Sequence, residues 1–552
     1  MSTSAPAPGR RLSPRVWLLA AIVAVVLTGW PGAVAIVVAI AVLAQRARPG
    51  DLVLLGGAGV GLALLAVLLD GLPTTASLSP DVVADNWPAH VFAAVALTLV
   101  TLGAFIDVRV TDDPPLPQLR TKGHAGRRWR VRRLTVLLGV VATVVLAGGF
   151  AFVYAAGEDS AAPAADRQLA DRLLAGEGLQ VRGEGGVKRP TAARLPVVPA
   201  VLAVANAGND PGPTERATWA LVGVTTALLC AATARRLHGN RAAVVTGGLV
   251  LLLPVFVLDH ARRDSTALAG LAAAALVAIV VHASGSRAPG WAIAAGGAAG
   301  LLALTRPEGL LIGAAIIGAW LVGTARAGRP RSGSYVAVVS ATMLLVVGPW
   351  LVRNHDQVGT WWPSSRVGEI VAGANADSTY RTGDLLGSYD PDAASAAGRD
   401  IDDGSSEGRR AGDQLGDGIR YATGHPLDAV RAAGARLLRA FELWDGRAER
   451  RVQEARGVDV GGWGWRQASF LVLLGMGVGA VVRRRRPGLD HLLPVLAGVA
   501  AAAVVAVLTY GDPIVRSTID PLIAVAAGGL FASRRADPAG PPGAATMPVV
   551  HQ

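Results

Sequence analysis

Residues 265–282 read STALAGLAAAALVAIVVH, an apolar run without a charged side chain. A helix rises about 1.5 Å per residue, so a run of this length approaches the thickness of a bilayer's hydrocarbon core. Backbone groups find no water there and must bond within the helix, which predicts a transmembrane helix. A charged turn, His260 to Asp264, precedes the run, and apolar runs alternate with short polar turns along the chain.

The composition fits this interpretation, because 52% of the 552 residues are hydrophobic, 17% are charged and the mean hydropathy is +0.43. We count about fourteen runs by the length rule for membrane helices. They lie near 16–30, 32–45, 52–70, 88–107, 134–156, 216–234, 241–258, 265–282, 288–304, 308–325, 334–352, 468–483, 489–509 and 517–533. The expected fold is therefore an all-α polytopic membrane protein with about fourteen transmembrane helices.

The basic residues predict the orientation of these helices. If the N-terminus is cytoplasmic, the short Lys and Arg clusters beside the runs fall on one side, as the positive-inside rule requires. They include Arg46 with Arg48, 127–133, 326–331 and 483–486. Both termini are thus expected in the cytoplasm of a plasma-membrane protein. The net charge of +12 is explained by topology, and no polar domain shows the basic and aromatic pattern of nucleic-acid binding.

The same alternation places 157–215 and 353–467 outside the cytoplasm. We divide the chain into an N-terminal membrane region with a basic linker, a membrane core whose first outer loop is 157–215, an outer segment, C-terminal membrane helices and a cytoplasmic tail. Their ranges are 1–133, 134–352, 353–467, 468–533 and 534–552. Cys230 is the only cysteine and lies in an apolar run, which excludes intrachain disulfides and cysteine-based metal sites.

The first outer loop carries the candidate catalytic acids Glu158, Asp159 and Asp166. A carboxylate held where a helix leaves the membrane can serve as a general base, because partial burial raises its pKa. The alternative is that these acids only cap helices in water. Asp166 opens a predicted short amphipathic helix, where the helix dipole alone explains an acid, so Asp159 is the favoured base.

Several motifs resemble those of GT-C glycosyltransferases, in the branch of protein mannosyltransferases and lipid A aminoarabinose transferases. They are the acids with the stretch Ala170 to Gly178, Leu304-Thr-Arg-Pro-Glu-Gly309, Gly348-Pro-Trp-Leu-Val-Arg-Asn354 and Tyr510-Gly-Asp-Pro-Ile-Val-Arg516. The resemblance covers 134–533 and implies a GT-C-like core preceded by four additional helices. It also implies transfer of a sugar from a polyprenyl-phosphate donor, with no cofactor and no required metal.

The candidate donor-binding residues lie at the predicted outer ends of the helices. A guanidinium there can hold a phosphate through two hydrogen bonds, although it can also contact lipid headgroups. The set is Arg263, Asp264, Arg306, Glu308, Arg353, Asn354 and Arg516.

The outer segment 353–467 is too long for an ordinary connection and is predicted to be a small domain or a lid. Its middle, 390–417, is rich in Gly, Ser and Asp and is predicted to be a flexible loop. An amphipathic helix is predicted from His425 toward Trp444, with Val430, Leu437 and Phe441 on its apolar side, lying on the bilayer or packed on the core.

The function that these features favour is an inverting glycosyltransferase with three partners: a polyprenyl-phosphate sugar, an acceptor outside the cytoplasm and the lipid bilayer. A transporter or flippase for lipid-linked sugars is the alternative, but it needs polar groups at mid-membrane depth, and the runs contain few. A non-catalytic scaffold of the cell envelope is the second alternative.

Overall fold

The computed structural model describes residues 164–182, 187–206, 211–284, 288–326, 333–381, 383–397, 406–455, 463–483 and 490–532. The five runs predicted between 16 and 156, and the acids Glu158 and Asp159, lie outside these residues. The described part is helical apart from one antiparallel hairpin, in which β1 (Gln180–Arg182) pairs with β2 (Lys188–Pro190). The expected all-α class is confirmed for this part of the chain.

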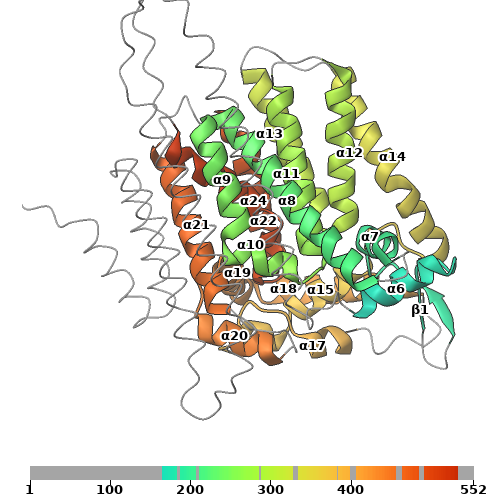
Figure 1. The fold of residues 1–552 in the computed structure, drawn as a ribbon. Helices are drawn as coiled ribbons and strands as arrows, with labels where there is room; N and C mark the ends of the chain where they lie inside the picture. Colours follow the sequence, from blue (N-terminus) through green and yellow to red (C-terminus); the bar gives the residue numbers. More distant parts are fainter. Residues whose placement is uncertain are drawn as a thin grey trace, which may run out of the picture.

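Apolar helices form a bundle whose members run side by side (Figure 1). They are α8 (Pro211–His238), α9 (Asn240–Leu252), α10 (Pro254–Ala261), α11 (Ser265–Ala283), α12 (Pro289–Thr305), α13 (Gly309–Arg326), α14 (Gly333–Val358), α21 (Trp463–Arg483), α22 (Leu493–Leu508) and α24 (Asp520–Gly528). Five helices in the described residues are long and apolar enough to cross a membrane, or six if α9 and α10 form one broken span. The chain is thus a multi-pass membrane protein.

One predicted span is broken. The run 241–258 was expected to be a single helix, but α9 and α10 meet at 53°. Leu253 is extended between them, with φ −70° and ψ 132°, and Pro254 begins α10. Proline has no N–H to donate and restricts the preceding residue to extended conformations, so the helix cannot continue through this point.

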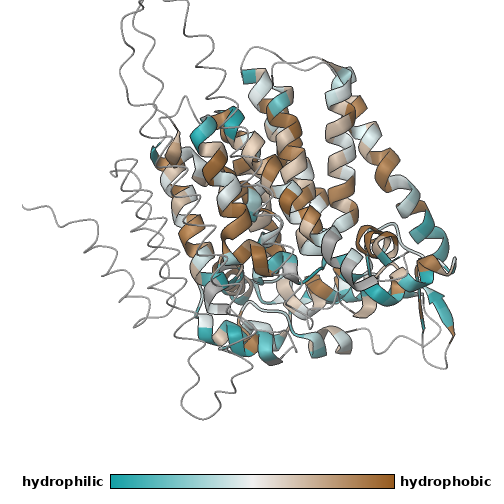
Figure 2. Cartoon of the chain, viewed as in Figure 1, coloured by the Kyte–Doolittle hydropathy of each residue, from teal (hydrophilic) through white to brown (hydrophobic). Residues whose placement is uncertain are grey.

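The polar elements gather at one end of the bundle, at the bottom of Figures 1 and 2. From the first outer loop come α6 (Ala164–Leu174) and the hairpin, with the short apolar helix α7 (Val197–Asn206) beside them. From the outer segment come α15 (Arg366–Ala374), α16 (Asp377–Arg381), α17 (Pro391–Ala396), α18 (Glu407–Gly424), α19 (Pro426–Ala440) and α20 (Gly446–Ala455). The short α23 (Pro513–Ser517) and the 3-10 turns η3 (Asp490–Leu492) and η4 (Gly529–Phe531) complete the described chain.

The prediction of a flexible loop over 390–417 is wrong at both of its ends, where α17 and the first half of α18 form. Each helix has an N-cap that the sequence supplies. The Asp390 side chain accepts from the backbone N–H groups of Asp392 and Ala393, and Ser406 accepts from that of Arg409. Polar composition hid these helices, because a half-exposed helix in an aqueous domain needs few large apolar residues.

Helix α19 confirms the amphipathic helix predicted after His425, and of the two placements predicted for its apolar side, packing on the core does not hold for Val430. The residues that it buries are Arg436 and Arg439 together with Ala432, Ala435 and Ala440, whereas Leu427 is 86% exposed and Val430 73%. Burying the arginines is possible because each finds partners: Arg436 donates to the carbonyl oxygens of Val507 and Ala374, and Arg439 to that of Leu386.

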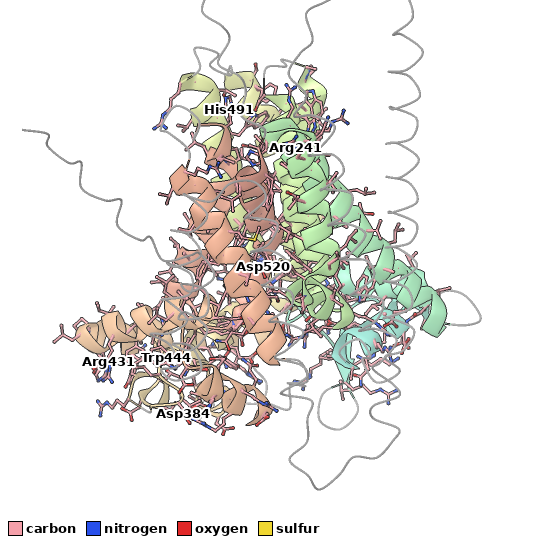
Figure 3. The ribbon with its side chains drawn as sticks, turned by 60° about the vertical axis from the view of Figure 1, so that its left-hand side comes forward. Arg241, Asp384, Arg431, Trp444, His491 and Asp520 are labelled. Carbon is pink, nitrogen blue, oxygen red and sulfur yellow. The ribbon has the colours of Figure 1, made fainter. Side chains whose placement is uncertain are left out.

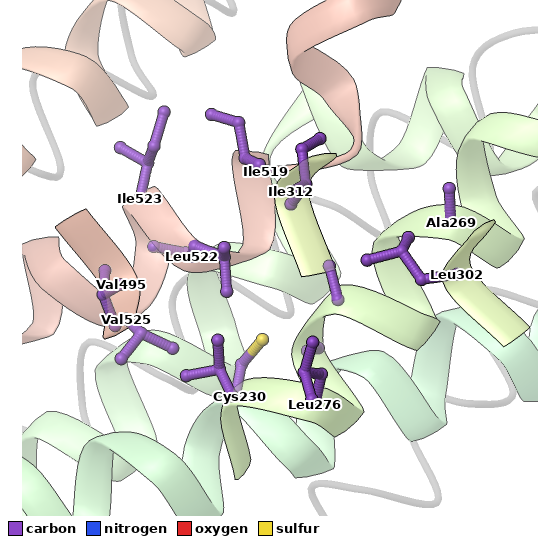
Figure 4. Packing of buried hydrophobic residues seen from close by; sticks show 14 of the residues in the cluster. Cys230, Ala269, Leu276, Leu302, Ile312, Val495, Ile519, Leu522, Ile523 and Val525 are labelled. Atoms are coloured by element: carbon purple, nitrogen blue, oxygen red, sulfur yellow. The ribbon is translucent and has the colours of Figure 1, made fainter. Parts of the chain in front are cut away.

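The core is built from small and medium apolar side chains shared by six or more helices. Figure 4 shows Cys230 of α8 near Leu276 of α11 and Val525 of α24, and all three side chains are at most 1% exposed. Close contact between α12 and α14 depends on two glycines: a Cβ atom at Gly296 would lie 2.4 Å from the Val339 carbonyl oxygen, and one at Gly300 would lie 2.7 Å from the Val346 Cβ atom.

Candidate functional site

A cluster of charged and hydroxyl-bearing side chains lies where the first outer loop, the ends of the apolar helices and the outer segment meet. Its members come from different segments: Asp166 from α6, Asp264 from the start of α11, Arg366 from α15 and Tyr510 from the turn after α22. The charge of Arg366 acts on Asp166, Tyr389 and Tyr510, and the charge of Asp264 acts on Asp166. We call this group the outer polar cluster.

Asp166 is the buried acid of the cluster, with 4% of its surface exposed. The nearest cation is Arg194, whose Nη1 lies 3.7 Å from Oδ2. Burial raises the pKa of Asp166 above its ordinary value of 3.8, Arg194 and Arg366 lower it in part, and the negative charge of Asp264 raises it further. A carboxyl group in this state can accept a proton at a higher pH than an exposed one, as a general base must.

Asp264 has a defined structural task. Its Oδ1 accepts a hydrogen bond of 2.8 Å from the backbone N–H of Thr266, which caps α11. Its Oδ2 lies 3.8 Å from Nε of Arg262, whose side chain is about one third exposed. One carboxylate oxygen is therefore used by the fold and the other is held only loosely.

The next candidate, Arg263, is almost completely buried and has a φ of 50°, an uncommon conformation for a non-glycine residue. Its Nη1 donates to Oε1 of Glu215 at 3.3 Å, and Arg167 of α6 donates to the same carboxylate at 3.1–3.2 Å. Glu215 thus joins the first outer loop to the turn before α11, and Arg263 is committed to this junction.

Arg306 and Glu308 form an ion pair with each other in the turn between α12 and α13. A second hydrogen bond, 3.3 Å long, joins Nη1 of Arg306 to Oγ1 of Thr266. Since Thr266 is also bonded to Asp264, the two turns at the outer ends of α11 to α13 are held together.

Arg353 fastens the first outer loop to the end of α14. Its two terminal nitrogens donate to the carbonyl oxygens of Thr191 and Leu179, at 2.6 and 2.7 Å, and its guanidinium lies over the Trp350 ring. Asn354 is fully buried and donates to the carbonyl oxygens of Trp362 and Pro363.

Arg516 is fully buried in an ion network beneath the outer segment. It pairs with Glu442 and with Asp520, and Glu442 also accepts from Arg466, which in turn donates to Asp259 at 3.0 Å. Figure 3 places Asp520 near the middle of the bundle's height. Both terminal nitrogens of Arg516 are thus bonded to carboxylates.

Three arginines that the sequence analysis did not select are held differently. Arg194, Arg262 and Arg366 are each about one third exposed, and each faces one acid at 3.7–3.8 Å: Asp166, Asp264 and Glu369 respectively. These ion pairs are too long for hydrogen bonds, so the guanidinium groups keep donors for a ligand. The sequence feature that could have indicated Arg366 is the pair Ser364 and Ser365 directly before it, which is typical of the start of a helix.

Two tyrosines complete the cluster. The Tyr389 hydroxyl donates to Glu369 at 2.6 Å, and its ring centroid lies 5.7 Å from that of Tyr510. Burial raises the pKa of both hydroxyls, that of Tyr510 to about 12. Both therefore remain protonated hydrogen-bond donors at physiological pH.

Among the described residues, no three His, Cys, Asp or Glu side chains are grouped as metal ligands would be. The acids that do meet in the cluster, Asp166 and Asp264, are instead accompanied by arginines. In the part of the chain that the structure describes, the cluster is suited to an anion beside a carboxylate.

One sequence family can now be compared with this site. Residues 197–352 match the family model described as dolichyl-phosphate-mannose-protein mannosyltransferase. The match covers less than half of the chain, from α7 into α14. It includes Asp264, Arg306 and Glu308 and ends one residue before Arg353. No curated protein matches the chain in sequence.

Two kinds of solved protein are similar to the chain. The apo oligosaccharyltransferase of Archaeoglobus fulgidus has 13% identity and a TM-score of 0.40, over 70% of this chain and 50% of that one. The same archaeal protein with an inhibitory peptide and a dolichol-phosphate has 14% identity and a TM-score of 0.35, over 66% and 45%. ArnT from Cupriavidus metallidurans, bound to undecaprenyl phosphate, has 15% identity and a TM-score of 0.34, over 71% and 77%. The chain thus spans about half the length of the archaeal structures.

Proposed function

We propose that this protein is a membrane glycosyltransferase of the GT-C type, which transfers a sugar from a polyprenyl-phosphate donor to an acceptor outside the cytoplasm. The observation that carries the proposal is the outer polar cluster, where the buried carboxyl of Asp166 lies 3.7 Å from the loosely held Arg194 and is also influenced by the charge of Arg366. The family match over 197–352 supports it independently.

In the proposed reaction, a carboxylate of the first outer loop takes the proton from an acceptor hydroxyl. The hydroxyl oxygen attacks the anomeric carbon from the side opposite the phosphate, and the bond between that carbon and the phosphate oxygen breaks. The bonding electrons leave with the lipid phosphate, so the configuration at the carbon inverts. No acid is needed for departure, because the phosphate carries the charge.

Asp166 is the member of the proposed acid set that the structure describes, and Asp159 and Glu158 stay in the set as the alternatives nearer the membrane helix. Arg194 and Arg366 are proposed to bind the donor phosphate, since charge-assisted hydrogen bonds from arginine match phosphate oxygens. The arginines already bound to carboxylates or carbonyl oxygens, such as Arg263 and Arg353, are proposed to fix the loops that form the site.

The test is a transfer assay in proteoliposomes, with a panel of radiolabelled polyprenyl-phosphate sugars and an extract of envelope acceptors. The variants are Asp166→Asn, Asp159→Asn and Glu158→Gln, and Asp171→Asn is the matched control, because Asp171 is an exposed residue of the same helix. Loss of the base should reduce transfer about 100-fold or more. The control should keep its activity.

Other results would support the alternatives. A transporter or flippase would move the intact lipid-linked sugar between leaflets and release no lipid phosphate. A scaffold would show neither reaction, and all three acid variants would leave the phenotype of the cells unchanged. Either result would overturn the proposed transfer.

A further inference from the structure

Helix α19 presents an apolar stripe to its surroundings. Leu427, Val430, Gly434 and Leu437 follow one another at steps of three and four residues, so they share one face of the helix. Leu427 is 86% exposed, Val430 73% and Leu437 38%, and nothing lies within 4 Å of a Cβ atom placed on Gly434. In an aqueous domain this is the face that ought to be polar.

The opposite face is the polar one, and it is fixed in place. Arg436 donates to the carbonyl oxygen of Val507 at 2.9 Å and to Oδ1 of Asn375 at 2.9 Å. Below it there is no space for a side chain at position 511, since a Cβ atom on Gly511 would lie 2.5 Å from the Arg436 Cα atom. The helix therefore cannot rotate to bury the stripe without breaking these contacts.

The level of α19 along the bundle follows from the same contact. Val507 lies in the last turn of α22, an apolar helix of the bundle, so α19 contacts the bundle at the C-terminal end of that helix. On α22 itself, Val504 is 47% exposed and Leu508 61%. Exposed apolar side chains therefore occur on both of the helices that meet at this contact.

One charged residue borders the stripe. Arg431 is exposed one position after Val430, and Figure 3 shows it at the lateral edge of the molecule. A long basic side chain beside an apolar face is typical of helices that lie in the membrane interface, where the guanidinium reaches lipid phosphates and the apolar face enters the acyl region.

We propose that α19 is an interfacial helix whose Leu427, Val430 and Leu437 side chains enter the outer leaflet of the bilayer. The outer segment is then held in two ways. The ion pairs and hydrogen bonds of its buried arginines hold it to the helix bundle, and this stripe holds it to the lipid. The inference needs no assumption about the proposed reaction, because it rests on exposure, the contact with α22 and the charge at the edge.

Spin labelling in proteoliposomes tests it. The sole cysteine, Cys230, is buried, so a cysteine introduced at the surface can be labelled selectively. Labels at Leu427→Cys and Val430→Cys are compared with a label at Leu345→Cys, on the exposed side of α14, and at Asp413→Cys, on the exposed side of α18. Each label is tested for collision with oxygen, which concentrates in lipid, and with a neutral nickel chelate, which stays in water.

In the outer leaflet, labels at 427 and 430 give a ratio of oxygen to nickel collisions several times that of the 413 label and close to that of the 345 label. A high nickel collision rate would show that the stripe faces water. Low rates for both reagents would show that protein covers it, either residues 1–163 or a second copy. Both of these results overturn the proposal.

Discussion

Arg516 and Glu442, 74 positions apart in the chain, form an ion pair in which neither side chain has more than 2% of its surface exposed. The pair joins α23, which precedes the last apolar helix α24, to the turn after α19. Asp520 binds the other side of the guanidinium, and Arg466 binds the same carboxylate oxygen of Glu442. This network joins the outer segment to the bundle.

Replacing Arg516 by Met should destabilise the protein by about 3–5 kcal/mol, because it leaves the Asp520 carboxylate buried without its partner. Thermal unfolding in detergent measures the loss. Arg420→Met is the control, since Arg420 pairs with Asp417 at the surface and such a pair contributes about 0–1 kcal/mol. Normal unfolding together with lost donor binding would instead support the role in phosphate binding that the sequence motif suggests.

Asp166→Asn should stop transfer and at the same time raise the melting temperature at pH 7. The folded-state pKa of Asp166 is raised, so folding favours its protonated form. Its contribution to stability is present below the unfolded pKa and is lost as the pH rises through the folded pKa. An asparagine at this position does not ionise, so the variant does not lose this stability at pH 7. A melting temperature that falls at pH 7 would mean that the carboxylate stabilises the fold.

The same raised pKa predicts how the rate depends on pH. If Asp166 is the base, transfer increases as the pH rises through its folded-state pKa, and the acidic limb lies at a higher pH than for an ordinary carboxyl group. Arg194→Gln removes the nearest positive charge and should move that limb to higher pH still. An unchanged limb would indicate that another acid, such as Asp159, is titrating.

Arg194→Gln and Arg366→Gln should each raise the KM for the polyprenyl-phosphate donor about tenfold or more, because each removes charge-assisted hydrogen bonds worth about 1.5–3 kcal/mol. Competition by undecaprenyl phosphate without a sugar should weaken in parallel. Arg409→Gln, at an exposed position of α18, is the control. Two variants with wild-type KM would remove both arginines from the donor site.

Arg353→Met should loosen the first outer loop while leaving the bundle intact, since Arg353 holds the carbonyl oxygens of Leu179 and Thr191 on either side of the β1–β2 hairpin. Hydrogen exchange should increase over residues 179–191 and remain unchanged in α11. Arg353→Lys keeps one charged donor group, so its exchange rate in this loop should lie between those of the wild type and of Arg353→Met. If exchange in the loop does not change, the loop has other anchors.

The two ends of the bundle should also differ in accessibility. Asp384 and Arg431 lie at the opposite end from Arg241 and His491 (Figure 3). With the orientation expected from the basic clusters, Asp384→Cys reacts with an impermeant thiol reagent in intact cells, and Arg241→Cys reacts only after the cells are opened. The reverse pattern would place the outer polar cluster in the cytoplasm.

The membrane helices were predictable because an apolar run must form internal hydrogen bonds in lipid. The ends were less predictable: α14 continues to Val358, so Arg353 and Asn354 lie inside a helix rather than after it. The break before α10 was also readable from Pro254. By contrast, the polar composition of α18 concealed a helix that begins at the local N-cap Ser406, and the orientation of α19 depends on distant carbonyl partners, which no local pattern contains.

The site shows the same division. Sequence motifs led to the acids and to arginines at helix ends, and the structure describes Asp166 and Asp264 in one cluster. Motifs did not separate arginines that hold the fold, such as Arg263, from those with donors to spare, such as Arg366. That difference is set by Glu215 and Glu369, and it becomes visible only when the ion-pair distances are known.

The contact between α12 and α14 bears on how this chain can change over time. The chain contains 68 glycines and many alanines. A substitution of glycine by alanine adds only a methyl group, so it changes the composition little. At Gly290 and Gly297 on α12, an added methyl group would meet nothing within 4 Å. At Gly296 and Gly300 it would strike α14, the helix that ends in the Arg353 contacts. Neighbouring positions of one helix thus differ in whether they have room for a methyl group, and a substitution at Gly296 or Gly300 is expected to disturb the helix that holds Leu179 and Thr191 of the first outer loop.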